Sequence, residues 1–451
     1  MAIFFFSSFP SPMKTSRCVF GGFRLPTDRT WSKQHPKIRT PRPLVDRFNL
    51  GRMHPHKEWW RERRLAPATF MGFPDVTKAE VAGYNLYTEQ MDAATLAVIL
   101  DKCVEEKIMN EEFWGKFSWR TQQLINKINE TEICYLFRSF SRRNWIDSHL
   151  MLSLWGRADF LLPRISLEDA SVLLEGYANE NFFNHKYERR VLEHIDALVT
   201  VRNDWTVSEL MKVASVIGRS SRSSATLSDL QDLRKRILST VMKKVIAKPG
   251  DLFDVSGHTV ANTLASMSVL GIPENDAKFV LCLVDELRDS RKLSSKSSGY
   301  HNSVVVAIKA LIGMKSSNLC PDLFQDLLIE YYDNIYQLSH SALCDILTVV
   351  DELDSSVLPP DHAEVLLLRI SREIYKMDKD EVCVVLRNLL QISNGSDMVS
   401  KCVGECIERL AVTGLEGVSG LDELRSAIAA APPQLHSDNL SKLGLVVELV
   451  L

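Results

Sequence analysis

The sequence predicts an all-α protein, an α-solenoid of about eight to nine helical hairpins, and two observations support this prediction. Apolar residues recur at i, i+3, i+4 and i+7, the spacing that puts four side chains on one helix face. These quartets return at intervals of roughly 40 residues from about residue 90 onward, a length typical of a two-helix repeat. A unit of that size cannot bury its apolar face alone, so neighbouring units are expected to stack.

The quartets give the expected core of each hairpin. They begin at Leu96, Ile133, Ala170, Leu210, Val260, Val304, Leu343 and Val382, with intervals of 37, 37, 40, 50, 44, 39 and 39 residues. A weaker ninth set begins 39 residues later, at Leu421. Second amphipathic segments between the quartets predict partner helices at 187–198, 230–244, 277–288, 323–335, 363–375 and 398–410. Two polar inserts, 218–228 and 290–299, lengthen their intervals, and the first is predicted to be a flexible loop.

Charge separates a basic head from an acidic body. Residues 1–64 carry 14 basic and 4 acidic side chains, whereas residues 65–451 carry 40 and 53. We therefore expect a basic transit or irregular segment (1–50), a basic aromatic arm (51–90), the hairpin repeats (91–431) and a C-terminal capping helix (432–451). The head is rich in Arg and Ser and poor in acids, which favours mitochondrial import and a matrix location over a plastid transit segment or an uncleaved basic tail. No run of 18 apolar residues predicts a membrane span.

Motifs that would indicate catalysis are absent from the sequence. The nine cysteines include no CxxC pair, and GxGxxG, GxxxxGK[ST] and HExxH do not occur. Cys402 and Cys406 lie four residues apart without further ligands, so we interpret them as core residues. Ser339 or Ser341, in a Ser-His-Ser sequence at a helix start, is interpreted as a helix N-cap. The sequence therefore predicts no cofactor, no metal site and no enzyme.

Two basic segments are candidate RNA contacts, because Arg and Lys neutralise phosphates without sequence preference. The first segment contributes Arg219, Arg222, Arg234, Lys235, Arg236, Lys243, Lys244 and Lys248. The second, 137–145, interleaves cations with aromatic rings and contributes Arg138, Arg142 and Arg143. The competing interpretation is a solvated helix face in the first segment, and burial of Phe137 and Phe140 in the core in the second.

A third basic segment, HKEWWRERR at 56–64, is predicted to contact a partner. Adjacent tryptophans cannot share one helix face, and tryptophan is enriched at interfaces. The expected partner-binding residues are Trp59, Trp60, Arg61, Arg63 and Arg64. Residues 300–451 carry 11 basic and 22 acidic side chains, so this part of the chain is net acidic. Any surface that faces phosphates is therefore expected in the first two thirds of the chain.

Residues 90–430 resemble the heptatricopeptide repeats of mitochondrial RNA-associated proteins. The resemblance rests on unit length and on quartet sequences such as SELMKVASVIG (208–218) and HSALCDILTVV (340–350). HEAT-type repeats match on length alone, and no C-terminal RAP-like segment is present. The resemblance implies a non-catalytic mitochondrial scaffold that works on rRNA or mRNA with other protein subunits, including as a subunit of the organellar ribosome. The alternative is a protein scaffold of another organellar complex without RNA contact.

Overall fold

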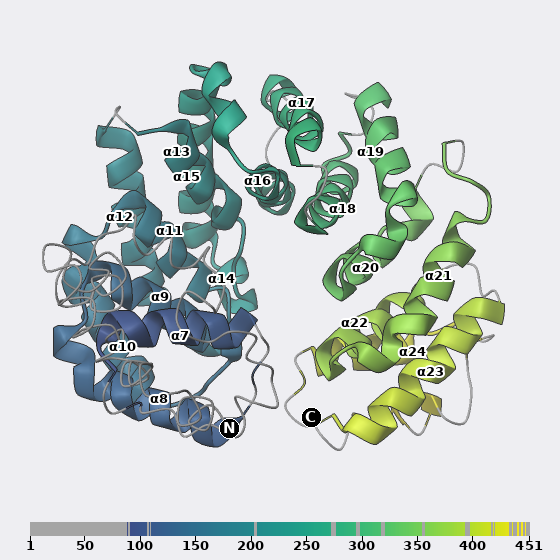
Figure 1. The fold of residues 1–451 in the computed structure, drawn as a ribbon, viewed down its shortest axis with the longest axis horizontal. Helices are drawn as coiled ribbons and strands as arrows, with labels where there is room; N and C mark the ends of the chain where they lie inside the picture. Colours follow the sequence, from purple (N-terminus) through teal and green to yellow (C-terminus); the bar gives the residue numbers. More distant parts are fainter. Residues whose placement is uncertain are drawn as a thin grey trace, which may run out of the picture. The chain divides into compact units, whose positions relative to one another are not determined.

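The computed structural model describes residues 88, 91–105, 108, 110–202, 205–271, 277–294, 298–316, 321–353, 357–392, 397–415, 418, 420–432, 435, 440–441, 443–444 and 447. Within these residues every regular element is a helix, which confirms the predicted all-α class (Figure 1). The predicted transit segment (1–50) lies outside the described residues, and so does the aromatic arm (51–90) apart from Thr88. In the predicted capping helix (432–451), the described positions 440, 441, 443, 444 and 447 are helical.

The chain forms two compact units, the first comprising Met1–Trp205 with Arg219–Thr240 and the second Thr206–Gly218 with Val241–Leu451. The α-helices of the first unit are α7 (Ala93–Glu105), α8 (Glu111–Leu124), α9 (Glu130–Arg143), α10 (Ser148–Leu161), α11 (Leu167–Gly176), α12 (His185–Val201), α14 (Arg222–Thr226) and the first part of α15 (Ser228–Ile246). Short 3₁₀ helices follow three of these helices or their loops: η4 (Ile125–Lys127), η5 (Leu162–Arg164) and η6 (Glu180–Phe182).

The second unit contains the end of α15 and a longer series of helices. Its α-helices are α13 (Val207–Ile217), α16 (Gly257–Leu270), α17 (Ala277–Ser294), α18 (Ser298–Gly313), α19 (Pro321–Asp333), α20 (His340–Leu347), α21 (His362–Glu373), α22 (Lys379–Leu389), α23 (Asp397–Thr413) and α24 (Leu421–Ala429). Its 3₁₀ helices are η7 (Pro249–Asp254), η10 (Ile335–Gln337), η11 (Val350–Glu352) and η12 (Ile374–Lys376).

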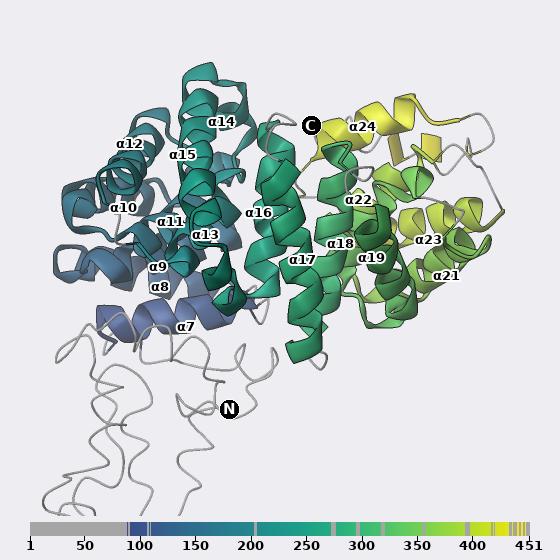
Figure 2. The same ribbon diagram turned by 90° about the horizontal axis from the view of Figure 1, so that it is seen from above.

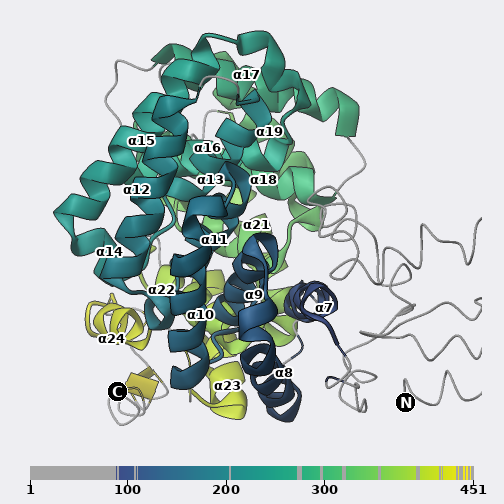
Figure 3. The same ribbon diagram turned by 90° about the vertical axis from the view of Figure 1, so that its left-hand side faces the viewer.

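The helices that carry the predicted quartets pack side by side within each unit. In the first unit α9 lies between α7 and α11 (Figure 3). In the second unit α16 packs against α13 and α18 (Figure 2), and α20 packs against α18 and α22 (Figure 1). Each of α7, α9, α11, α16, α18, α20 and α22 also packs against the α-helix that follows it in Figure 1's numbering. All side chains of the quartets are between 0% and 9% exposed, so the core prediction is confirmed.

A short joint recurs ahead of the quartet helices. A buried apolar residue is followed by an N-cap side chain that accepts a backbone N–H from the first helical turn, which would otherwise lack a partner. The joints of this kind are Ile128–Asn129, Ile165–Ser166, Val255–Ser256, Leu338–Ser339 and Met377–Asp378. Of the two serines predicted as N-caps, Ser339 is the cap, and the same two-residue pattern marks the start of four other helices.

The first polar insert differs from its prediction as a flexible loop. Segment 218–228 contains the short helix α14, and Ser221 and Ser224 within it are buried at 3% and 0% exposure. The Ser224 hydroxyl donates to Glu188 at 2.8 Å, so a polar sequence is buried because its hydroxyls find acceptors. The insert at 290–299 is also helical at both ends, since α17 extends to Ser294 and α18 begins at Ser298.

A close approach between α13 and α16 depends on Gly218. A Cβ at this position would overlap the backbone Cα of Ser266, whose hydroxyl accepts the Gly218 N–H at 3.2 Å. Backbone atoms cannot move aside as a flexible side chain can, so Gly218→Ala is expected to lower the free energy of unfolding by about 1–3 kcal/mol. Chemical denaturation measures the loss.

Gly404, inside α23, is the matched control for this prediction. A Cβ there meets nothing within 4 Å, and alanine favours a helix over glycine by up to about 1 kcal/mol. Gly404→Ala is therefore expected to be neutral or stabilising. Equal losses for the two variants would contradict the packing explanation for Gly218.

Candidate nucleic-acid interface

Arg138 lies on α9, inside the row formed by α7, α9 and α11. Its side chain is 5% exposed and donates to Asp101 at 2.6 Å, while a second guanidinium nitrogen lies 3.5 Å from Glu175. Asp101, Arg138 and Glu175 are spaced by 37 residues in the sequence. The same position of the repeat is therefore acidic on α7, basic on α9 and acidic on α11. The prediction that Arg138 contacts RNA is wrong, because its charge is buried between two carboxylates.

Arg142 and Arg219 share the Glu175 carboxylate. Arg142 bonds Glu175 at 2.6 Å and Arg219 does so at 2.5 Å. Burial alone would raise the pKa of Glu175, but the charges of Arg142, Arg138 and Arg219 outweigh it and lower that pKa to about 2. Both arginines are partly exposed, with side-chain exposures of 39% and 37%, so each retains a face toward solvent.

Arg143, Phe137 and Phe140 of segment 137–145 contact the core of the first unit. The Arg143 guanidinium carbon lies 5.8 Å from the centre of the Trp114 ring, in a cation–π arrangement. Phe137 and Phe140 are fully buried, as the competing interpretation predicted. Base stacking on these two rings is therefore excluded, since stacking needs an exposed face.

Arg234 is fully buried on α15. It forms an ion pair with Glu188 of α12, which is also 0% exposed, and donates to the backbone carbonyl of Arg219 at 2.9 Å. The prediction that Arg234 contacts RNA is wrong as well. The apolar neighbours Leu233 and Ile237 place this side of α15 against the unit's interior, and the guanidinium is tolerated there because Glu188 neutralises it.

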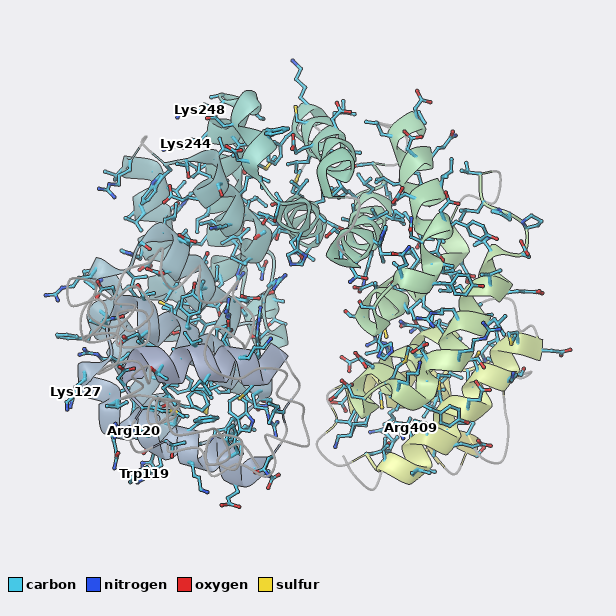
Figure 4. All side chains as sticks on the ribbon, viewed as in Figure 1. Trp119, Arg120, Lys127, Lys244, Lys248 and Arg409 are labelled. Atoms are coloured by element: carbon cyan, nitrogen blue, oxygen red, sulfur yellow. The ribbon has the colours of Figure 1, made fainter. Side chains whose placement is uncertain are left out.

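The other cations of segment 219–248 lie toward solvent where the structure describes them. Arg236 is 64% exposed and pairs with Asp196 at 2.7 Å, whereas Lys235 is exposed without a described carboxylate partner. In the second unit, Lys243 and Lys248 are exposed and Lys244 is half-buried. Figure 4 shows Lys244 and Lys248 close together near the end of α15.

Some predicted contacts lie beyond the described structure. The side chain of Arg222 is not described, although its backbone belongs to α14. The predicted partner-binding residues Trp59, Trp60, Arg61, Arg63 and Arg64 all lie outside the described residues.

Basic side chains that the sequence predictions missed lie on α8, α10 and α12, the helices that follow the quartet helices of the first unit. Arg120 donates to the Met91 carbonyl, and Arg157 donates to the Ile128 carbonyl, at 2.7 Å and 2.6 Å respectively. His194, 37 residues after Arg157, lies 2.9 Å from the Ile165 carbonyl through its Nε2 atom. The sequence signal for this set is the same 37-residue interval that separates the quartets.

The described part of the chain contains neither a cluster of metal ligands nor a membrane-spanning helix. Within it, no group of three or more His, Cys, Asp or Glu side chains could hold a metal ion. Cys402 and Cys406 are buried in α23, where burial raises the pKa of the Cys402 thiol to about 12. None of the helices searched there combines the length and apolar character needed to cross a membrane.

The fold and surface chemistry define an all-helical protein of repeated helix pairs that carries partly exposed cations in its first unit and near the end of α15. No known protein family model matches the sequence, and a search of curated proteins found no matching relative.

Proposed function

We propose that this chain is a non-catalytic, RNA-associated scaffold of the mitochondrial matrix, built as an α-solenoid of helical hairpins. The observation that carries the proposal is that Lys235 in the first unit, and Lys243 and Lys248 in the second, are each exposed on or just after α15 and have no carboxylate partner among the described residues. Such cations release counterions from a phosphate backbone and provide salt-dependent affinity. The pairwise packing of quartet helices within each unit supports the solenoid, and the basic head supports import.

The proposed RNA is mitochondrial rRNA or mRNA, and the assembly is a ribonucleoprotein such as the organellar ribosome. The heptatricopeptide-like repeat length supports this assignment. Acidic residues dominate 300–451, so the later helices are proposed to contact protein subunits.

A protein scaffold without RNA contact is the second candidate. The observation that favours it is the capture of Arg138, Arg142, Arg219, Arg234 and Arg236 by carboxylates of the same chain. In that case the basic head serves import alone.

Gradient sedimentation of the tagged full-length protein from organelle lysate, with and without ribonuclease, separates these functions. Co-migration with a ribosomal subunit at moderate salt supports the ribosomal form of the proposal. A heavy complex that collapses with ribonuclease supports an mRNA or processing complex. A heavy complex that resists both ribonuclease and salt would instead favour the protein scaffold.

The triple variant Lys235→Gln/Lys243→Gln/Lys248→Gln is expected to weaken RNA retention by the purified protein. Each lost phosphate contact lowers the slope of log affinity against log salt by about 0.7, so the slope should fall by about 2. The variant Lys278→Gln/Lys315→Gln/Lys401→Gln removes equal charge from other exposed positions and should leave the slope near that of the wild type. Equal slopes for the two variants would exclude the α15 lysines as phosphate contacts.

A further inference from the structure

A pair of basic positions repeats on two neighbouring helices of the first unit, and each helix also carries one exposed aromatic ring. Arg120, Gln123 and Lys127 lie at i, i+3 and i+7 along α8 and η4. Arg157, Phe160 and Arg164 reproduce this spacing 37 residues later, along α10 and η5. Residues at these intervals share one helix face, and α8 packs against α10. The two triads therefore lie on adjacent elements of the same unit.

Main-chain carbonyls hold the two arginines in place. Arg120 donates to the Met91 carbonyl through Nε at 3.0 Å and Nη2 at 2.7 Å. Arg157 donates to the carbonyls on either side of Lys127, at 2.6 Å to Ile128 and 3.2 Å to Asn126. These carbonyls carry no net charge, so the contacts position the two guanidinium groups without neutralising them. The second contact also places Arg157 directly beside the backbone of Lys127.

Few acidic groups oppose these cations. Lys127 and Arg164 are exposed, and among the described residues neither has a carboxylate partner. Asp159, on the same helix as Arg157, is paired with Arg190 at 2.5 Å. Burial raises the pKa of Glu132 to about 8, which keeps that carboxyl largely neutral at pH 7. Asp92, next to Met91, and Glu130, in the first turn of α9, both lie near Glu132, and the cations Lys127, Arg157 and Arg164 outnumber these two acids.

Two large aromatic rings accompany the cations on the surface. Trp119 is 49% exposed and Phe160 is 70% exposed, whereas Trp114 on the same helix as Trp119 is fully buried. The Arg157 guanidinium carbon lies 5.4 Å from the centre of the Phe160 ring. Figure 4 shows Trp119, Arg120 and Lys127 along one edge of the first unit. Exposed rings beside cations offer a stacking face for a base next to a contact for a phosphate.

We propose that Trp119, Arg120, Lys127, Arg157, Phe160 and Arg164 form a binding surface for single-stranded RNA. This inference rests on the proposed RNA-associated function and identifies where the strand lies. The cations follow the phosphate backbone from one helix pair to the next, and the rings stack on bases without reading their sequence. An acidic polypeptide would satisfy the cations but leave both rings unused, so RNA fits the surface better.

The test measures binding of a labelled uridine oligonucleotide of about ten residues to the full chain across a salt series. Lys127→Gln/Arg164→Gln is expected to lower the salt slope by about 1.4 and to weaken binding roughly tenfold at low salt. Phe160→Leu is expected to weaken binding about fivefold with the slope unchanged, because a stacking contact carries no charge. Lys127, Arg164 and Phe160 are all exposed, so neither variant removes core packing.

The control Lys278→Gln/Lys315→Gln removes the same charge from exposed positions of the second unit and should bind like the wild type. If the wild type binds the oligonucleotide and Lys127→Gln/Arg164→Gln binds it as well as the control does, the proposed binding surface is wrong while the proposed function stands. If polyglutamate of equal charge displaces the oligonucleotide as well as unlabelled RNA does, the surface is a site for acidic protein. If the wild type fails to bind even at low salt, both proposals are overturned.

Discussion

Arg234→Met is expected to lower the free energy of unfolding by about 3–5 kcal/mol, measured by chemical denaturation. Arg234 and its partner Glu188 are both 0% exposed, so removal of the guanidinium leaves a carboxylate buried without a counter-charge. The Ser224 hydroxyl, which donates to Glu188 at 2.8 Å, is too weak a partner to replace a cation. The loss therefore reflects an uncompensated charge more than lost packing.

A second substitution separates charge from packing. Glu188→Gln in the Arg234→Met background removes the stranded charge and keeps an oxygen that accepts the Ser224 hydroxyl, so it should recover about half of the lost stability. Lys235→Met, at the exposed neighbouring position, should change stability by less than about 0.5 kcal/mol. A double variant no more stable than Arg234→Met would contradict the assignment of the loss to Glu188.

Stability is expected to fall between pH 5 and pH 8 because of Glu132. Burial, the main cause, raises the pKa of this carboxyl from 4.5 to about 8, against the opposing hydrogen bond from the Asn129 N–H. In this window the folded chain holds a proton that the unfolded chain has released, so stability decreases as pH rises and levels off above the folded-state pKa. The shift from 4.5 to about 8 corresponds to about 5 kcal/mol in full, at about 1.4 kcal/mol per pKa unit, and most of it is lost between pH 5 and pH 8.

Glu132→Gln should remove this dependence on pH. The side-chain oxygen of a glutamine at position 132 can also accept the Asn129 backbone N–H in the capping box, so the cap on α9 is retained without a titrating group. Denaturation at pH 5, 6, 7 and 8 should show the variant gaining on the wild type as pH rises. Glu175 does not interfere, because its pKa of about 2 means that its contribution is lost only below pH 4.5. Parallel curves for the two proteins would contradict the raised pKa of Glu132.

The helices and their core were predictable because the information is local. The face of a helix is determined by residues three and four positions apart, and quartets such as Val382, Val385, Leu386 and Leu389 are buried as predicted. The N-cap of α20 at Ser339 was also predicted from its neighbours. The joints at Ile128–Asn129 and Met377–Asp378 repeat the same pattern, so they too were accessible from sequence.

The fate of the basic residues could not be predicted in the same way. Arg234 and Lys235 are adjacent in sequence, yet one is fully buried and the other exposed. The difference depends on which side of α15 meets α12, where Glu188 lies 46 residues away. The burial of serines in segment 218–228 has the same origin, because Glu188 also accepts the Ser224 hydroxyl.

The sequence by itself determined the all-helical class and the apolar residues of each quartet, since both follow from the period of a single helix. Tertiary structure alone decided which cations form ion pairs with distant carboxylates and which remain exposed to solvent. Arg138 is held by Asp101 and Glu175, each 37 residues away, whereas Lys127 and Arg164 meet solvent. An ion pair of this kind forms only when helices distant in the sequence pack together. The strength of the attraction depends on the distance between the two charges in space and is independent of their separation along the chain.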